Sequence, residues 1–104
     1  MAEAATSEQR AQGLQGLDGL PGGLGGMLFE FPDARETSFH MRTVGFDLDM
    51  WWFDADGVLI GSTLMEECLD GACVSYPSPG PIRWALETEA GVFDFEIGSV
   101  LETP

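Results

Sequence analysis

The sequence predicts a compact, mainly β domain of the α+β class: an antiparallel or mixed sheet, or a barrel-like fold, with one or two short helices. Three observations lead to this prediction. Short runs alternate apolar with polar side chains, turn-forming residues separate the runs, and a helical pattern is confined to one or two segments. The chain has 104 residues, the length of one domain. We therefore expect a single domain over residues 1–104, with residues 1–5 as a flexible tail.

The helical pattern lies near the N-terminus. Thr6 or Ser7 can cap a short helix over residues 6–15, with an acidic residue in its first turn. Residues 16–26 then carry six of the fourteen glycines. Because no strand precedes these glycines and no Lys or Ser/Thr follows them, they are typical of a loop and not of a phosphate-binding motif.

The strand pattern occupies the rest of the chain. The clearest hairpin joins residues 48–53 to residues 58–65, because Gly57 supplies the positive φ that an Asp-Gly turn requires. Residues 92–97 are ambiguous, since they alternate like a strand and also carry apolar residues one helical turn apart. The other expected strands are residues 27–31, 37–44, 83–88 and 99–102, and a long acidic loop with three prolines covers residues 66–82.

The charge balance excludes several classes of partner. Four basic residues, all arginine, stand against eighteen acidic ones, for a net charge of −14. So few cations cannot neutralise a phosphate backbone, and an anionic membrane surface would repel the chain. No apolar run is long enough to span a bilayer, and the N-terminus has neither the basic start nor the apolar stretch of an intact signal peptide. We expect a monomer whose partner is a small molecule or a protein.

The two cysteines, Cys68 and Cys73, enclose four residues that include an Asp-Gly pair. A structural disulfide, two reduced thiols and a metal site are the three interpretations. The spacing is not a usual zinc spacing, and His40 is the sole histidine, so no metal site is expected. A disulfide would favour an oxidising, extracytoplasmic compartment over the cytoplasm.

His40 and Asp49 are the candidate catalytic residues. His40 is the one side chain that ordinarily titrates near neutral pH, so it is the first place to look for a general acid or base. On a strand its side chain points away from those of Phe39 and Met41, toward solvent or a cleft. The plainer interpretation is a surface histidine and a structural carboxylate.

Aromatic residues supply the candidate ligand contacts Trp51, Trp52 and Tyr76. On an alternating strand Trp51 and Trp52 face opposite sides, so one of them covers a second layer, lines a pocket or faces a partner. Packing beneath the loop of residues 66–82 is the plainer interpretation of that second tryptophan.

A set of motifs follows a fixed order along nearly the whole chain: Arg10–Leu14, Gly26–Phe31, Phe39–Arg42, Leu48–Asp49, Trp52–Gly57, Cys68, Cys73–Pro77, Trp84–Glu87, Gly91 and Ile97–Gly98. This ordered set resembles the uncharacterised family DUF192, also labelled UPF0127. The resemblance implies a compact β-rich domain, often in exported or envelope-associated proteins, and no established reaction. Two departures are His40, where the family commonly has tryptophan, and Asp47, where it commonly has proline.

Together these features predict a non-catalytic accessory or ligand/partner-binding domain that needs no cofactor. One alternative is a small hydrolase-like or metal-assisted enzyme that uses His40 and Asp49. Another is a purely structural interaction module.

Overall fold

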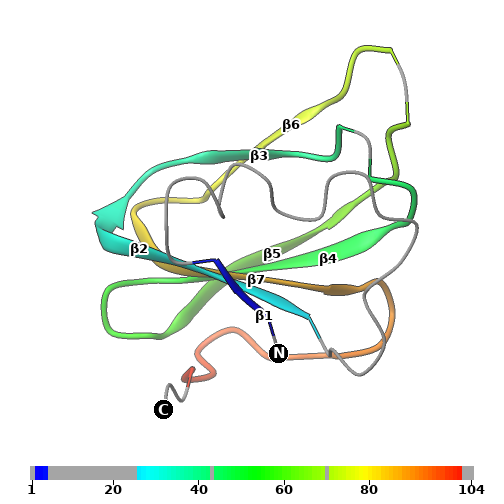
Figure 1. Cartoon of the computed structure of the whole chain (residues 1–104). Helices are drawn as coiled ribbons and strands as arrows, with labels where there is room; N and C mark the ends of the chain where they lie inside the picture. The colour runs from blue at the N-terminus through cyan, green and yellow to red at the C-terminus, as the bar shows by residue number, and fades with distance from the viewer. Residues whose placement is uncertain (1, 5–25, 43, 70, 102–104) are drawn as a thin grey trace.

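The computed structural model describes residues 2–4, 26–42, 44–69 and 71–101 (Figure 1). Within these ranges the chain forms strands and no helix, which confirms the mainly β prediction. The helix predicted over residues 6–15 lies outside the described residues, as does most of the glycine-rich loop that follows it.

Five strands form one sheet, in the order β1 (Ala2–Ala4), β2 (Met27–Arg35), β7 (Ile82–Glu89), β4 (Leu48–Phe53) and β5 (Leu59–Met65). β1 runs parallel to β2 and all the other neighbours are antiparallel, so the sheet is mixed. Residues 2–4 thus pair with β2, where the sequence predicts a flexible tail.

A second, two-stranded antiparallel sheet consists of β3 (Ser38–His40) and β6 (Ser75–Pro77), and it lies over one face of the large sheet (Figure 1). The ring of Phe39 in β3 reaches down between the sheets. Its centroid lies 5.9 Å from that of Phe29 in β2 and 6.5 Å from that of Trp52 in β4. We call the covered face of the large sheet its inner face and the opposite one its outer face.

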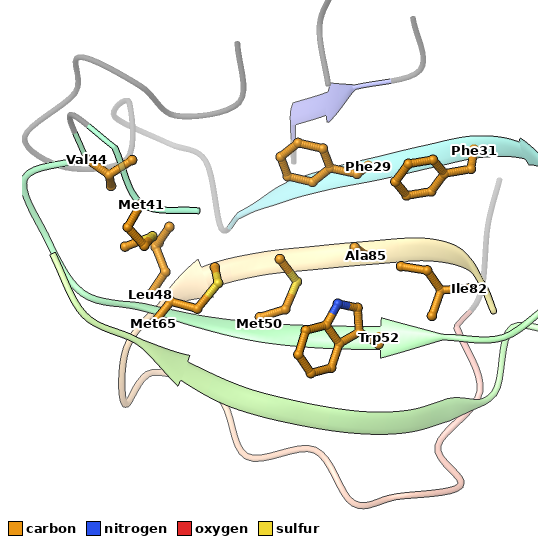
Figure 2. Packing of buried hydrophobic residues seen from close by; sticks show 10 residues of the cluster. All are labelled: Phe29, Phe31, Met41, Val44, Leu48, Met50, Trp52, Met65, Ile82 and Ala85. Carbon is orange, nitrogen blue, oxygen red and sulfur yellow. The ribbon is translucent and has the colours of Figure 1, made fainter. Parts of the chain in front are cut away.

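The main core fills the space between the two sheets. Apolar side chains at alternate positions of β2 and β4, together with Ile82 and Ala85 of β7, point to the inner face, and Figure 2 shows them gathered there. Burial of this apolar surface is the dominant stabilising contribution. The buried members are Phe29, Phe31, Met41, Val44, Leu48, Met50, Trp52, Met65, Ile82 and Ala85.

A smaller core lies on the outer face, where the C-terminal segment (residues 91–101) crosses the sheet. Its backbone bonds at both ends, from the Gly91 N–H to Asp49 Oδ2 at 3.0 Å and from the Leu59 N–H to the Ser99 carbonyl at 2.8 Å. The buried residues beneath it are Leu28, Trp51, Phe53, Leu59 and Leu86, with Trp84 and Leu101 packed against them.

The predicted hairpin between β4 and β5 is confirmed. The Asp54 carboxylate accepts hydrogen bonds from the backbone N–H groups of Asp56 and Val58, and Gly57 has a φ of +78°. This pattern is an Asx turn closed by a residue in the left-handed region, which glycine adopts without a Cβ penalty.

Other predicted boundaries differ from the structure. β2 continues beyond Pro32 because the strand pairing shifts between Glu30 and Arg35, so the proline falls in an irregular stretch. β3 is shorter than the strand predicted over residues 37–44. Residues 92–97 form neither strand nor helix. Of the strand predicted over residues 99–102, the described part (residues 99–101) contributes one isolated bridge, from Val100 to Val58.

Candidate functional site

His40 is an exposed residue of the small sheet. It ends β3, pairs with Ser75 of β6, and accepts a hydrogen bond on Nδ1 from the backbone N–H of Arg42 at 3.2 Å. Since Phe39 points into the core, the His40 side chain points away from the large sheet.

Asp49 lies on the outer face of the large sheet, between Leu48 and Met50, whose side chains occupy the inner core. Its carboxylate accepts the Gly91 N–H and so anchors the start of the C-terminal segment. The large sheet and its inner core separate Asp49 from His40, so the structure does not bring the two candidate catalytic residues together.

The tryptophans face opposite sides of β4, as predicted. Trp52 is buried in the inner core beneath the small sheet, and its indole N–H has no hydrogen-bond partner. Trp51 is buried on the outer face, where its Nε1 donates to Thr88 Oγ1 at 3.0 Å. Neither ring is accessible to a ligand in this conformation.

Tyr76 and the cysteines organise the loop above the inner core. Tyr76 packs against that core, and its hydroxyl accepts the Glu66 N–H at 3.3 Å. Cys68 and Cys73 are joined by a disulfide with their Cα atoms 5.9 Å apart, a separation typical of such bonds. These residues hold the loop in place.

Glu87 is the titratable residue that the sequence reasoning overlooked. It lies in β7 opposite Met27 and Met50, it is 5% exposed, and burial raises the pKa of its carboxyl from the ordinary 4.5 to about 8. The signal was its position, because Glu87 shares the strand face of Ala85, which is a core position. The protonation of this buried carboxyl affects the stability of the fold, and Glu87 does not form a site with His40 or Asp49.

The main exposed apolar surface lies on the C-terminal segment. Phe93 and Phe95 stack with their ring centroids 5.4 Å apart, and Phe95 meets Trp51 edge-on at 4.8 Å. Trp51 thereby supports the aromatic pair from below. Of the eight exposed large hydrophobic residues in the described part of the chain, five belong to this segment: Val92, Phe93, Phe95, Ile97 and Val100. We call these five side chains the C-terminal apolar surface.

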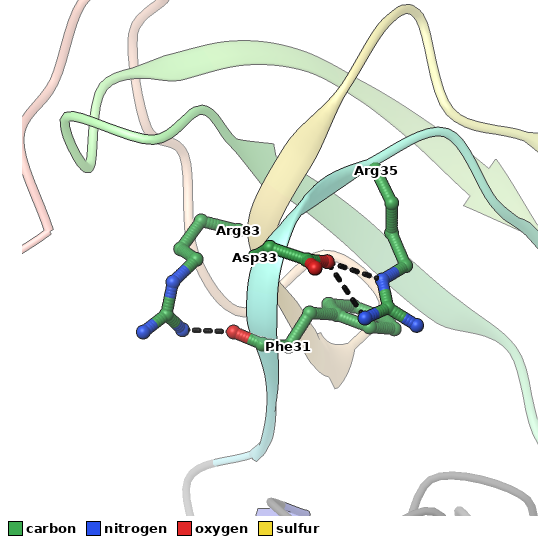
Figure 3. A network of polar contacts seen from close by, with 4 residues as sticks. All are labelled: Phe31, Asp33, Arg35 and Arg83. Carbon is green, nitrogen blue, oxygen red and sulfur yellow. Dashed lines mark hydrogen bonds and ion pairs between the residues drawn. The ribbon is translucent and has the colours of Figure 1, made fainter.

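Two of the arginines are already partnered close to β2 (Figure 3). Arg83 donates to the Phe31 carbonyl and lies 3.6 Å from the Glu30 carboxylate, while Arg35 pairs with Asp33 at 2.7 Å. These cations therefore neutralise the protein's own carboxylates and do not form an open anion site.

The described residues contain neither a metal-binding cluster nor a membrane-spanning helix. No three His, Cys, Asp or Glu side chains gather there closely enough to hold a metal ion. No helix in that part of the chain is long and apolar enough to cross a bilayer.

This arrangement defines a mainly β protein whose described titratable side chains are scattered over both faces. The chain belongs to the family DUF192, described as "Uncharacterized ACR", whose model matches residues 1–102. The resemblance noted from the motif order is thereby confirmed.

Two solved structures are similar over 86% of this chain. One, from Sinorhizobium meliloti 1021, is provisionally described as a transcription regulator; it is 28% identical, with a TM-score of 0.69 and 67% of its own chain covered. The other, from Novosphingobium aromaticivorans DSM 12444, is described as a protein of unknown function; it is 26% identical, with a TM-score of 0.67 and 62% of its own chain covered. This chain thus spans about two thirds of their length. The comparison with curated proteins gives no match.

Proposed function

We propose that this protein is a non-catalytic accessory domain that binds a partner protein through its C-terminal apolar surface. The observation that carries the proposal is the concentration of exposed apolar side chains on one short segment, since exposed apolar residues are normally scattered singly. Aromatic residues are enriched in the cores of protein interfaces, and Phe93 and Phe95 would supply them.

The segment is held well enough to act as a binding surface. Bonds to Asp49 and Leu59 fix its two ends, and Trp51 supports Phe95 in the middle. A surface that is ordered before binding loses less conformational entropy on association. The charge of −14 on each copy disfavours self-association, so a monomer that binds a different protein is the expected state.

Catalysis receives no support from the positions of its two candidates. A general base must lie within hydrogen-bond reach of its partner or of a substrate held between them. His40 and Asp49 lie on opposite sides of the large sheet, so they cannot share a substrate.

The Sinorhizobium protein is provisionally described as a transcription regulator, but regulation through DNA contact also receives no support in this chain. Phosphate contacts need several unpaired cations on one surface. The chain has four arginines and no lysine, and Arg35 and Arg83 are paired with carboxylates.

An extracytoplasmic location is part of the proposal. The Cys68–Cys73 disulfide is its support, since such bonds persist in oxidising compartments and are rare in the cytosol.

Photo-cross-linking in the native cells tests the proposal. A photoreactive phenylalanine analogue replaces Ile97, and a control replaces Val74, which directly follows Cys73 and is as exposed, at 65% against 66% for Ile97. We expect a discrete protein adduct from position 97 and none from position 74, and loss of that adduct in Phe93→Asp. Equal adducts from both positions, or none from position 97, would contradict the proposal.

A further inference from the structure

β5 is an edge of the large sheet. One edge of β5 pairs with β4. Along the other edge, which we call the free edge, the C-terminal segment bonds only near the start of the strand: the Gly98 N–H donates to the Leu59 carbonyl at 2.9 Å, and the Leu101 N–H donates to the Gly57 carbonyl at 2.7 Å. Within the described residues no strand pairs with the free edge of residues 61–65.

The backbone groups that point away from β4 there belong to Ser62 and Leu64. Leu59 bonds outward to the C-terminal segment, and a bulge between the Phe53 and Trp52 pairings adds one residue to β5. In an antiparallel ladder, successive residues direct their backbone groups alternately inward and outward. Counting past the bulge, the N–H and C=O groups of Ser62 and Leu64 point away from β4, and no described residue accepts their N–H groups. The Leu64 carbonyl accepts a long hydrogen bond from the neighbouring Thr63 hydroxyl, at 3.4 Å.

This edge lacks the features that normally prevent strand addition. Natural edge strands carry charges, especially lysine, or proline, or are covered by another element. β5 has the sequence Leu-Ile-Gly-Ser-Thr-Leu-Met, with neither a charged residue nor a proline, and Leu64 is 50% exposed.

The open edge adjoins the C-terminal apolar surface. Ser62 pairs across the ladder with Trp51, which supports Phe95, and Leu64 pairs with Asp49, which bonds the start of the C-terminal segment. A strand added to β5 would therefore lie beside that surface.

Acidic residues flank the edge at both ends. Asp54 and Asp56 precede β5, and Glu66 and Glu67 follow it; Asp94 and Glu96 lie on the neighbouring segment. Of the arginines in the described ranges, Arg35 ends β2, Arg83 lies near the start of β7, and Arg42 lies beside Cys68, beyond the end of β5.

We propose that the β5 edge receives an extended, lysine- or arginine-bearing segment of the partner protein, which adds to the sheet as a further strand beside Ser62 and Leu64. This inference rests on the proposed function, and it specifies the chemistry of the partner. Main-chain hydrogen bonds would supply affinity, as in other strand-addition complexes, and the flanking acids would select a basic segment. A second copy is the poorer occupant because it carries the same charge of −14.

A peptide titration of the full chain tests the inference. The probe is a peptide of about ten residues that alternates valine with lysine, followed by backbone amide NMR. We expect saturable shifts centred on the amides of Ser62 and Leu64, slower hydrogen exchange at both, and weaker binding as salt screens the charges. The matched peptide with glutamate in place of lysine should not bind. Absence of saturable shifts at these amides, or equal binding of the two peptides, would overturn the inference.

Two sets of variants sharpen the test. Ser62→Pro removes an outward N–H without removing a bond to β4 and should weaken binding at least about tenfold. If that variant unfolds, Leu64→Lys and Leu64→Glu place opposite charges on the same edge, and the lysine variant should bind about tenfold more weakly than the glutamate variant. Equal affinities in that pair would contradict the basic partner.

The outcome is separable from that of the proposed function. Ile97→Asp alters the C-terminal apolar surface without changing the edge. Cross-linking from position 97 without a response of the Ser62 and Leu64 amides would support partner binding and contradict strand addition. Peptide binding at these amides without cross-linking from position 97 would contradict the proposed contact through the C-terminal apolar surface, while the edge itself would still accept a strand.

Discussion

The carboxyl group of Glu87 links the stability of the fold to pH. In the folded chain the carboxyl is buried, and desolvation raises its pKa to about 8, whereas the unfolded chain has the ordinary value of 4.5. Between these values the unfolded state releases the proton and the folded state retains it. The unfolded state then binds fewer protons, so the free energy of unfolding falls as pH rises.

We therefore predict that stability is greatest below about pH 4.5 for this contribution and is lost progressively up to about pH 8. The full effect is on the order of 5 kcal/mol. Glu87→Gln, which mimics the neutral acid, should flatten this slope and be more stable than the wild type at pH 8, while Glu89→Gln at an exposed position of the same strand should not. Urea unfolding from pH 5 to pH 8 measures both, and parallel slopes for wild type and Glu87→Gln would contradict the assignment.

Gly26 illustrates a different residue-scale constraint, that of close backbone approach. A Cβ at this position would lie 2.6 Å from the Glu87 carbonyl oxygen and 3.1 Å from Thr88 Cγ2. Because the nearer atom is backbone, the strand itself would have to move.

We predict that Gly26→Ala lowers the free energy of unfolding by about 2–3 kcal/mol. The control is Gly80→Ala, whose Cβ would meet nothing within 4 Å, and which should change it by less than about 0.5 kcal/mol. Chemical denaturation compares the two variants, and equal effects would show that the β2–β7 packing tolerates the added methyl group.

At the scale of elements, the predictions succeeded where the local signal and the tertiary contacts agree. The β4–β5 hairpin could be predicted because Asp54 and Gly57 specify the turn and each strand alternates. The predicted strand ends before Pro32, whereas β2 continues to Arg35. The irregular pairing that accommodates the proline depends on β7, which is distant in sequence. Residues 92–97 alternate like a strand, but their apolar side chains cover Trp51 or face solvent, and no partner strand is present in the described residues.

The candidate site was less predictable than the fold. His40 and Asp49 have suitable side chains, but whether two strands bring such residues together is set by layer and sheet order, which the local pattern does not contain. The opposite orientations of Trp51 and Trp52 follow from strand alternation alone and were predicted. Glu87 is not predictable from its charge, which favours the surface; its burial follows from its place on the core-facing side of β7, opposite Met50.

The loop between β5 and β6 supplies an element-scale prediction. The disulfide closes a loop with a sequence separation of 5, and restricting so short a loop in the unfolded chain contributes about 2 kcal/mol. Protein isolated from its native compartment should show no reactive thiol when unfolded, and two after reduction. Reduction should lower the free energy of unfolding by that amount. Two thiols before reduction would place the protein in a reducing compartment.

At the scale of the whole molecule, the net charge of −14 and the exposed apolar segment act together. The charge opposes self-association, so an apolar surface can remain exposed without joining copies of the chain. It also favours association with a partner of opposite charge. In the proposed function the fold would combine an apolar contact surface with electrostatic selection, and its two candidate catalytic residues lie on opposite sides of the large sheet.

The most direct test is the affinity of the cross-linked partner for three forms of the full chain, measured by isothermal titration calorimetry: wild type, Ile97→Asp and Val74→Asp. Both variants place a carboxylate at an equally exposed apolar position, but only the first alters the C-terminal apolar surface. The account predicts at least about tenfold weaker binding for Ile97→Asp and an affinity within about twofold of wild type for Val74→Asp. Equal affinities for the two variants would contradict it.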